Sequence, residues 1–112
     1  NRRIDEGLSE IKRLQQLNSF NFLICLHPRL GFSEDPRDDY YEEKAHQFGF
    51  PSFRMYDYYK CSGVAPCNLV LKQFPEDRTH PNELGHEIIA NAMFLELKKN
   101  GFINGGLSCS GK

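Results

Sequence analysis

Residues 20–28 read FNFLICLHP, and this short stretch decides the fold class of the chain. From Phe20 to Leu26 the run is apolar except for Asn21, and His27-Pro28 closes it. A strand that is buried on both faces has this nearly continuous apolar character, because helices cover both sides of a parallel sheet. The stretch therefore predicts a strand over residues 20–27 in an α/β protein.

The segments on either side of this strand predict a βαβ unit with a helix before it. Asp35-Pro36 is a typical helix start and predicts a helix over 36–48, and the alternating residues 52–57 predict a second strand. The two strands should be parallel neighbours, since a helix connects them. The preceding helix is indicated by apolar residues spaced three or four apart: Ile4, Leu8, Ile11, Leu14 and Leu17.

The last predicted helix has clear signals at both ends. Asn82 is a good N-cap, and Gly101 follows a last turn that contains Lys98 and Lys99. The inward stripe should consist of Leu84, Ile88, Ala92 and Leu95, with Ile89 and Met93 beside it. Residues 58–76 contain Gly and Pro breakers and are expected to be irregular. Residues 1–103 are therefore interpreted as part of one domain, and 104–112 as a flexible tail.

Length and charge exclude several classes of protein. The chain has 112 residues, the size of one ordinary domain, and a net charge of −1 with acids and bases intermixed. This pattern argues against nucleic acid as a partner. The longest apolar run is too short for a transmembrane segment. Because two strands cannot bury both faces of a sheet, we expect the chain to be the C-terminal part of a larger α/β domain.

The four cysteines give limited information. Cys25 lies in the apolar run and is expected to be buried, whereas Cys61 and Cys67 flank a short loop that a disulfide would close. Cys109 is then left over in the tail. An even number of cysteines fits an oxidising compartment, outside the cytoplasm, without requiring one. No C-x-x-C spacing is present, which argues against a zinc ribbon or a thioredoxin-type site.

The stretch DRTHPNELGH, residues 77–86, is the main candidate for chemistry. A catalytic histidine needs a carboxylate that fixes its tautomer and stabilises the imidazolium. Asp77 and His80 are three residues apart before a helix and can meet locally. Pro81 restricts His80 to an extended backbone. In open α/β sheets, reactive groups gather beyond the carboxyl ends of the strands, and a loop before the last helix reaches that edge.

Residues 77–82, with Gly85-His86 and Ile88-Ile89-Ala90, resemble the last conserved block of the SGNH (GDSL) esterase and lipase superfamily. The order of elements upstream is similar to the C-terminal half of that family. The resemblance implies a three-layer α/β/α sandwich with a parallel, flavodoxin-like sheet, and ester hydrolysis through an acyl-enzyme. It assigns His80 as the general base and Asp77 as its orienting acid.

The chain lacks the early sequence blocks of the family pattern. The nucleophilic serine of a Gly-Asp-Ser block and the oxyanion donors of two further blocks are absent. The chain is thus expected to need the N-terminal half of the same domain, and to be inactive alone. Its substrate would be a lipid ester, an acetylated sugar or a small acyl ester. The alternative is a non-catalytic α/β binding module that keeps the scaffold.

The remaining candidates stay open between functional and structural roles. His27 and Arg29 follow the first strand on the expected reactive edge, where they would contact substrate or line a solvated loop. The tyrosines at 56, 58 and 59 would form a wall for an acyl group or a sugar, or part of the core. His86-Glu87 begins like a zinc-binding H-E-x-x-H motif, but residue 90 is alanine. We therefore expect no metal and no cofactor.

Overall fold

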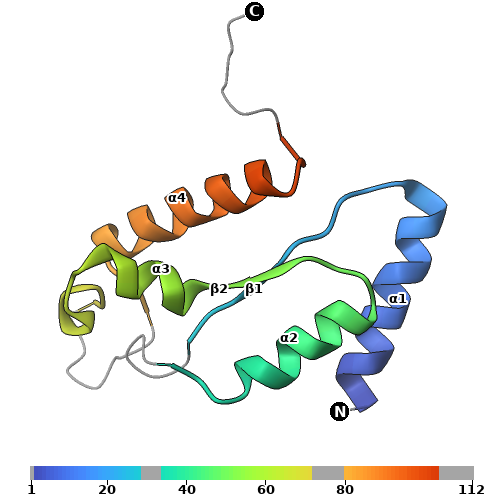
Figure 1. Ribbon diagram of the computed structural model, residues 1–112, viewed down its shortest axis with the longest axis horizontal. Coiled ribbons are helices and arrows are strands. Elements are labelled where there is room, and N and C mark those ends of the chain that lie inside the picture. Colours follow the sequence, from blue (N-terminus) through green and yellow to red (C-terminus); the bar gives the residue numbers. More distant parts are fainter. Residues whose placement is uncertain (1, 29–33, 72–79, 104–112) are drawn as a thin grey trace, which may run out of the picture.

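The computed structural model describes residues 2–28, 34–71 and 80–103. The tail predicted at 104–112, with Cys109, lies outside these ranges. The described part is a mixed α/β structure with four α-helices and a two-stranded parallel sheet (Figure 1). Along the chain the elements are α1 (Arg2–Asn18), β1 (Ile24–Leu26), α2 (Asp38–Gln47), β2 (Ser52–Arg54), α3 (Met55–Ser62), the 3-10 helix η1 (Pro66–Asn68) and α4 (Glu83–Lys99).

The predicted parallel pair of strands is confirmed, although both strands are shorter than expected. Ile24, Cys25 and Leu26 pair with Ser52, Phe53 and Arg54 in that order. Ladder pairing requires a partner strand, and β2 offers only these three residues. The segment 20–23 therefore precedes the strand instead of belonging to it.

The prediction of a strand over 52–57 is wrong from Met55 onward, and so is the prediction that residues 58–76 are irregular throughout. Helix α3 starts at Met55 and runs to Ser62. Met55 and Tyr59 are buried and Tyr58 packs against the same core. Spacings of three and four residues place these side chains on one face of a helix, whereas a strand would turn Tyr58 to the opposite face. Gly63 then ends α3 with a φ of 73°, a left-handed conformation that favours glycine.

The first two helices lie close to the predicted positions. Helix α1 ends at Asn18 as expected. Helix α2 begins at Asp38, two residues later than predicted. The reason is a turn at Asp35, whose side-chain Oδ1 accepts from the Arg37 backbone N–H at 3.0 Å and whose carbonyl accepts from Asp38 N–H at 3.0 Å. Gly49, with φ 76°, reverses the chain after α2.

The main core lies between the strand pair and the helices α3 and α4. It contains the buried residues Phe53, Met55, Tyr59, Leu69, Val70 and Ala92. Ile88, Ile89 and Met93 of α4 pack against this core. The predicted stripe of α4 is therefore wrong in part, because Leu84 and Leu95 are 40% and 48% exposed whereas Gly85, Ala92 and Glu96 are buried. The helix is rotated so that its smallest residue, Gly85, faces the Leu69 carbonyl and Pro81.

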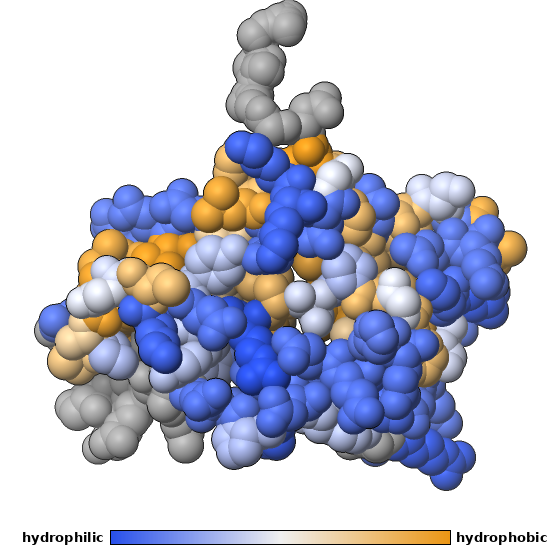
Figure 2. Space-filling view, viewed as in Figure 1, coloured by the Kyte–Doolittle hydropathy of each residue, from blue (hydrophilic) through white to orange (hydrophobic). Residues whose placement is uncertain are grey.

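The opposite side of the strand pair carries α2 and has a different chemical character. Helices α2 and α4 lie on opposite sides of the strands (Figure 1), and the side of α2 is mostly hydrophilic at the surface, while hydrophobic residues gather at α3 and α4 (Figure 2). Helix α1 has no buried residue. It is attached through an ion pair of 2.9 Å between Asp5 and Lys44 of α2, and Lys12 lies over the ring of Phe50.

Candidate functional site

Three segments meet at the edge of the sheet where β1 and β2 end. His27 directly follows β1, α3 directly follows β2, and the loop with His80 leads into α4, which packs against α3. Figure 1 shows the strand ends, α3, η1 and the first turn of α4 gathered on one side of the molecule. This is the edge at which the sequence predicts reactive groups. Asp77 and Arg29 lie outside the described residues.

The backbone around His80 is fixed by the segment 69–71. Val70 and Pro81 form an isolated antiparallel bridge, the Leu71 N–H donates to the His80 carbonyl at 3.0 Å, and the Asn82 N–H donates to the Leu69 carbonyl at 2.8 Å. The side chain of His80 is exposed. The imidazole is thus accessible on a backbone that is held at the His80 carbonyl and at the two residues that follow it.

Asn82 performs the capping role that the sequence predicts. Its side-chain Oδ1 accepts from the Gly85 N–H at 2.8 Å, and its backbone is extended, which starts α4. Its Nδ2 donates to the Asn68 carbonyl at 2.8 Å. One side chain therefore caps the helix and ties η1 to the loop that contains His80.

Gly85 allows the start of α4 to approach this segment closely. A Cβ at this position would lie 2.7 Å from the Leu69 carbonyl oxygen and 2.7 Å from Cβ of Pro81. Both contacts are too short for any side chain, and neither neighbour is a flexible group. The glycine of the 77–90 motif therefore has a structural reason in this chain: it brings the entrance of α4 against the carbonyl that holds Asn82.

His27 is the second histidine of the edge, and its ring is held in one orientation. Its Nδ1 lies 2.9 Å from the Pro28 carbonyl, and its Nε2 lies 2.7 Å from the hydroxyl of Tyr59. Because a carbonyl only accepts, Nδ1 carries the proton and the Tyr59 hydroxyl donates to Nε2 in the neutral ring. Burial lowers the pKa of His27, with the Pro28 carbonyl opposing the shift. This favours the neutral form.

The geometry of His27 fits a positioning role better than a direct substrate contact. Both ring nitrogens are occupied, and the ring lies edge to face with that of Tyr59 at 5.5 Å between centroids. Tyr59 itself is 3% exposed, and burial raises its pKa. The pair therefore anchors the end of β1 to α3.

A buried carboxylate on α4 was not predicted from the sequence. Glu96 is 7% exposed, and its Oε2 accepts from the Tyr58 hydroxyl at 2.6 Å. This hydrogen bond, with burial and the negative charge of Glu96, raises the pKa of Tyr58 to about 12. Burial and then the charge of Glu96 raise the pKa of the Cys25 thiol to about 11. A thiol this difficult to ionise is a poor nucleophile, so Cys25 belongs to the packing.

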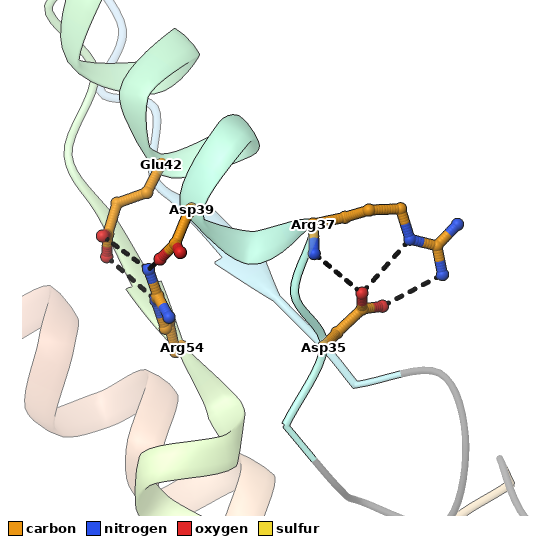
Figure 3. Close-up of polar contacts among 5 residues, drawn as sticks. All are labelled: Asp35, Arg37, Asp39, Glu42 and Arg54. Atoms are coloured by element: carbon orange, nitrogen blue, oxygen red, sulfur yellow. Dashed lines mark hydrogen bonds and ion pairs between the residues drawn. The ribbon is translucent and has the colours of Figure 1, made fainter.

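The charged cluster at the end of β2 attaches α2 to the sheet (Figure 3). Arg54 Nη2 contacts Asp39 Oδ1 at 2.6 Å and Glu42 Oε1 at 2.8 Å, and its Nε donates to Glu42 Oε2 at 3.3 Å. These contacts raise the pKa of Arg54. Beside them, Arg37 pairs with Asp35 at 3.1 Å, and this pair is local to the start of α2. Arg54 already has two carboxylate partners, so we interpret the cluster as structural.

The structure does not contain the expected disulfide between Cys61 and Cys67: both residues are exposed free thiols. Cys61 is in the last turn of α3 and Cys67 in η1. The segment between them is closed in another way: the Ser62 hydroxyl donates to the Tyr59 carbonyl at 2.6 Å and accepts from the Val64 N–H at 3.2 Å. His86, which could have packed at the helix entrance, is exposed.

The described part of the chain holds neither a candidate metal centre nor a helix suited to a bilayer. Within residues 2–28, 34–71 and 80–103, no three or more His, Cys, Asp or Glu side chains are grouped so that they could hold a metal ion. Each helix in those ranges lacks the length or the apolar character needed to cross a membrane.

Comparisons with known proteins give no assignment. No family model matches the chain, and the searches of curated proteins and of solved structures find no match.

Proposed function

We propose that this chain is the C-terminal portion of a serine ester hydrolase of the SGNH type. In the complete domain, a three-layer α/β/α sandwich, His80 is the general base and Asp77 its orienting acid. The nucleophilic serine and the oxyanion donors belong to polypeptide outside these 112 residues. No metal or organic cofactor takes part in this reaction.

The observation that carries the proposal is the placement of His80. Its side chain is exposed, its backbone is held by Leu71 and by the bridge between Val70 and Pro81, and it leads into α4, which packs against α3 after the end of β2. A general base must be accessible to the substrate and yet fixed relative to the scaffold, since small errors in position reduce the rate strongly. Of the two histidines at this edge, His80 is the one whose ring is exposed, because His27 is half-buried against Tyr59.

The proposed reaction needs only one proton carrier. The neutral imidazole of His80 accepts the serine hydroxyl proton as the oxygen attacks the ester carbonyl, and it then protonates the departing alkoxide. In the second half, the same ring accepts a proton from water, which attacks the acyl-serine and releases the acid. The ring then gives this proton to the departing serine oxygen, which restores the serine hydroxyl and the neutral imidazole, so atoms and charges balance over the cycle.

A second observation supports the view that the domain is incomplete. The described sheet has two strands, and a sheet this small is not stable without further strands or more cover. Large hydrophobic side chains are also exposed on the helices, among them Leu17 of α1 (68%) and Leu95 of α4 (48%). Further strands and helices of the same domain would cover these side chains.

The test uses the full-length protein that contains this chain and measures hydrolysis of p-nitrophenyl acetate. His80→Ala should reduce kcat by roughly 10²–10⁴-fold, the usual contribution of a general base. His86→Ala is the matched control, because His86 is an exposed histidine six residues later on α4 and should leave kcat unchanged. Turnover of His80→Ala equal to that of His86→Ala would reject the role of His80, and absence of turnover in the parent protein would favour the non-catalytic module.

A further inference from the structure

A hollow between α3 and the turn that follows it has no role in the proposed catalysis. It has a volume of about 340 Å³, which is within the range of small-ligand sites. The side chains around it are Tyr56, Tyr59 and Lys60 of α3 and Val64, Ala65 and Pro66 of the turn. We propose that this hollow binds the hydrocarbon chain of a carboxylic acid or its ester. The proposal rests on the ester hydrolase function and names its substrate class.

Local hydrogen bonds preform the walls of this hollow. Gly63 turns the chain back with φ 73°, and its N–H donates to the Lys60 carbonyl at 3.3 Å. The Ser62 hydroxyl links the Tyr59 carbonyl to the Val64 N–H. Val64 also packs against the main core. All lining residues come from one segment, 56–66, so the hollow does not depend on polypeptide from elsewhere.

The chemistry of the lining selects an apolar ligand with a polar or negative end. Two tyrosine rings and the aliphatic groups of Val64, Ala65 and Pro66 form the walls. The hydroxyl of Tyr59 is engaged with His27. Lys60 is the charged group of the lining, is exposed, and forms no ion pair among the described residues. An ammonium at the mouth of an apolar hollow complements a carboxylate or an ester carbonyl.

The hollow is connected to both histidines of the edge. Tyr59 lines the hollow and forms a hydrogen bond with His27. Pro66, another lining residue, begins η1, and Asn68 at the end of η1 accepts a hydrogen bond from Asn82, two residues after His80. The proposal places the acyl chain in this hollow, with the ester bond toward this edge. If each methylene takes roughly the 30 Å³ of a water molecule, the hollow holds at most about ten carbons. We therefore expect esters of medium-length acids, in preference to acetylated sugars.

Binding can be measured on the full-length protein that contains this chain without any catalysis, because free carboxylic acids have no ester bond to hydrolyse. Sodium octanoate, hexanoate and butyrate are titrated into the protein by isothermal calorimetry, below their micelle concentrations. Affinity should rise with length, by about fourfold for each methylene that is buried. Saturable binding of octanoate with butyrate weaker by roughly tenfold or more is the expected result. Equal affinity for the three acids would overturn the proposal.

Two variants locate the binding site. Ala65→Trp fills the hollow from an exposed position, and it should weaken octanoate by roughly tenfold, the loss of two buried methylenes or more. Ala90→Trp, at an exposed alanine of α4 outside the hollow, is the matched control and should bind like the parent protein. Lys60→Gln should weaken octanoate by about threefold, because an exposed charge pair contributes little.

The outcomes separate this proposal from the catalytic one. If Ala65→Trp binds octanoate as tightly as Ala90→Trp, the hollow is not the site, whatever the result for His80. If octanoate binds as expected and His80→Ala retains full turnover, the acyl site stands and the general-base role fails. Circular dichroism of both tryptophan variants shows that they remain folded.

Discussion

The two sides of the strand pair are held by different forces. On the side of α3 and α4, the contacts are apolar, with Met55, Leu69 and Ala92 fully buried. On the side of α2, the buried Ala45 is accompanied at the strand end by ionic contacts from Arg54 to Asp39 and Glu42. Loss of buried apolar contacts lowers the free energy of unfolding strongly and does not depend on salt. Exposed ion pairs contribute little to that free energy and are screened by salt. The loop with His80 is attached to the apolar side, where its position is better fixed.

The largest effect should come from a cavity on the apolar side. Met55→Ala removes one of the two largest fully buried side chains and should lower the free energy of unfolding by about 2–5 kcal/mol. Urea denaturation followed by circular dichroism measures it. Gln16→Ala, at an exposed polar side chain of α1, is the control and should change stability by less than about 0.5 kcal/mol. A similar loss for both variants would contradict the assignment of the core.

The next effect concerns the close approach at the entrance of α4. Gly85→Ala should destabilise by about 1–3 kcal/mol, since the new Cβ would clash with the Leu69 carbonyl and Pro81. Gly7→Ala is the matched control, because Gly7 is in helix α1 with nothing within 4 Å of the added Cβ. There the same change should stabilise by up to about 1 kcal/mol. Thermal unfolding of the two variants should therefore move in opposite directions.

A smaller loss of stability is expected when the hydrogen bond between Tyr58 and Glu96, on the side of α3 and α4, is removed. Tyr58→Phe leaves the buried carboxylate of Glu96 without the hydroxyl that now donates to it, and should cost about 1–2 kcal/mol. Tyr56→Phe is the control, since the Tyr56 hydroxyl makes no hydrogen bond to any residue that the structure describes. If both substitutions are neutral in urea denaturation, the contact contributes nothing.

The same hydroxyl predicts an alkaline pH dependence. The pKa of Tyr58 is about 12 in the folded chain against the ordinary value of 10, so the folded state keeps this proton longer than the unfolded state. Its contribution to stability is fully present below pH 10 and is lost as the pH rises from 10 to 12. Tyr58→Phe should remove this part of the alkaline loss. An unchanged profile between pH 10 and 12 would contradict the shift.

The smallest effect should come from the ionic side. Arg54→Gln removes the contacts to Asp39 and Glu42 and should cost about 0.2–1 kcal/mol at low salt, with little difference left at about 1 M NaCl. Arg37→Gln, which breaks only the local pair with Asp35, is the control and should cost less. A loss for Arg54→Gln as large as that for Met55→Ala would show that the ionic side matters as much as the core.

How far the fold followed from the sequence depended on how local each signal was. Helices α1 and α4 could be predicted because their signals are the chain's own: the spacing in α1, and Asn82 and Gly101 at the ends of α4. Helix α3 was missed, because Met55, Tyr58 and Tyr59 in an apolar segment fit either a strand or a helix until the position of the core is known.

The candidate site shows the same division. The residue types at 77–82 indicate His80 on chemical grounds alone, and the cap by Asn82 is confirmed. The partner of His27 could not have been predicted, since Tyr59 is 32 residues away and meets it only because α3 packs against β1. The burial of Glu96 could not have been predicted either. A glutamate on a helix is normally exposed, and only the rotation of α4 about Gly85 turns it inward.

The amino-acid sequence by itself determined the parallel strand pair and the helices with strong end signals, and it indicated His80 as the candidate base, because these depend on neighbours along the chain. The tertiary structure alone decided which face of α4 is buried, and which histidine is held against a tyrosine while the other stays exposed. Those choices depend on contacts between residues far apart in the sequence, where packing leaves room for only one arrangement.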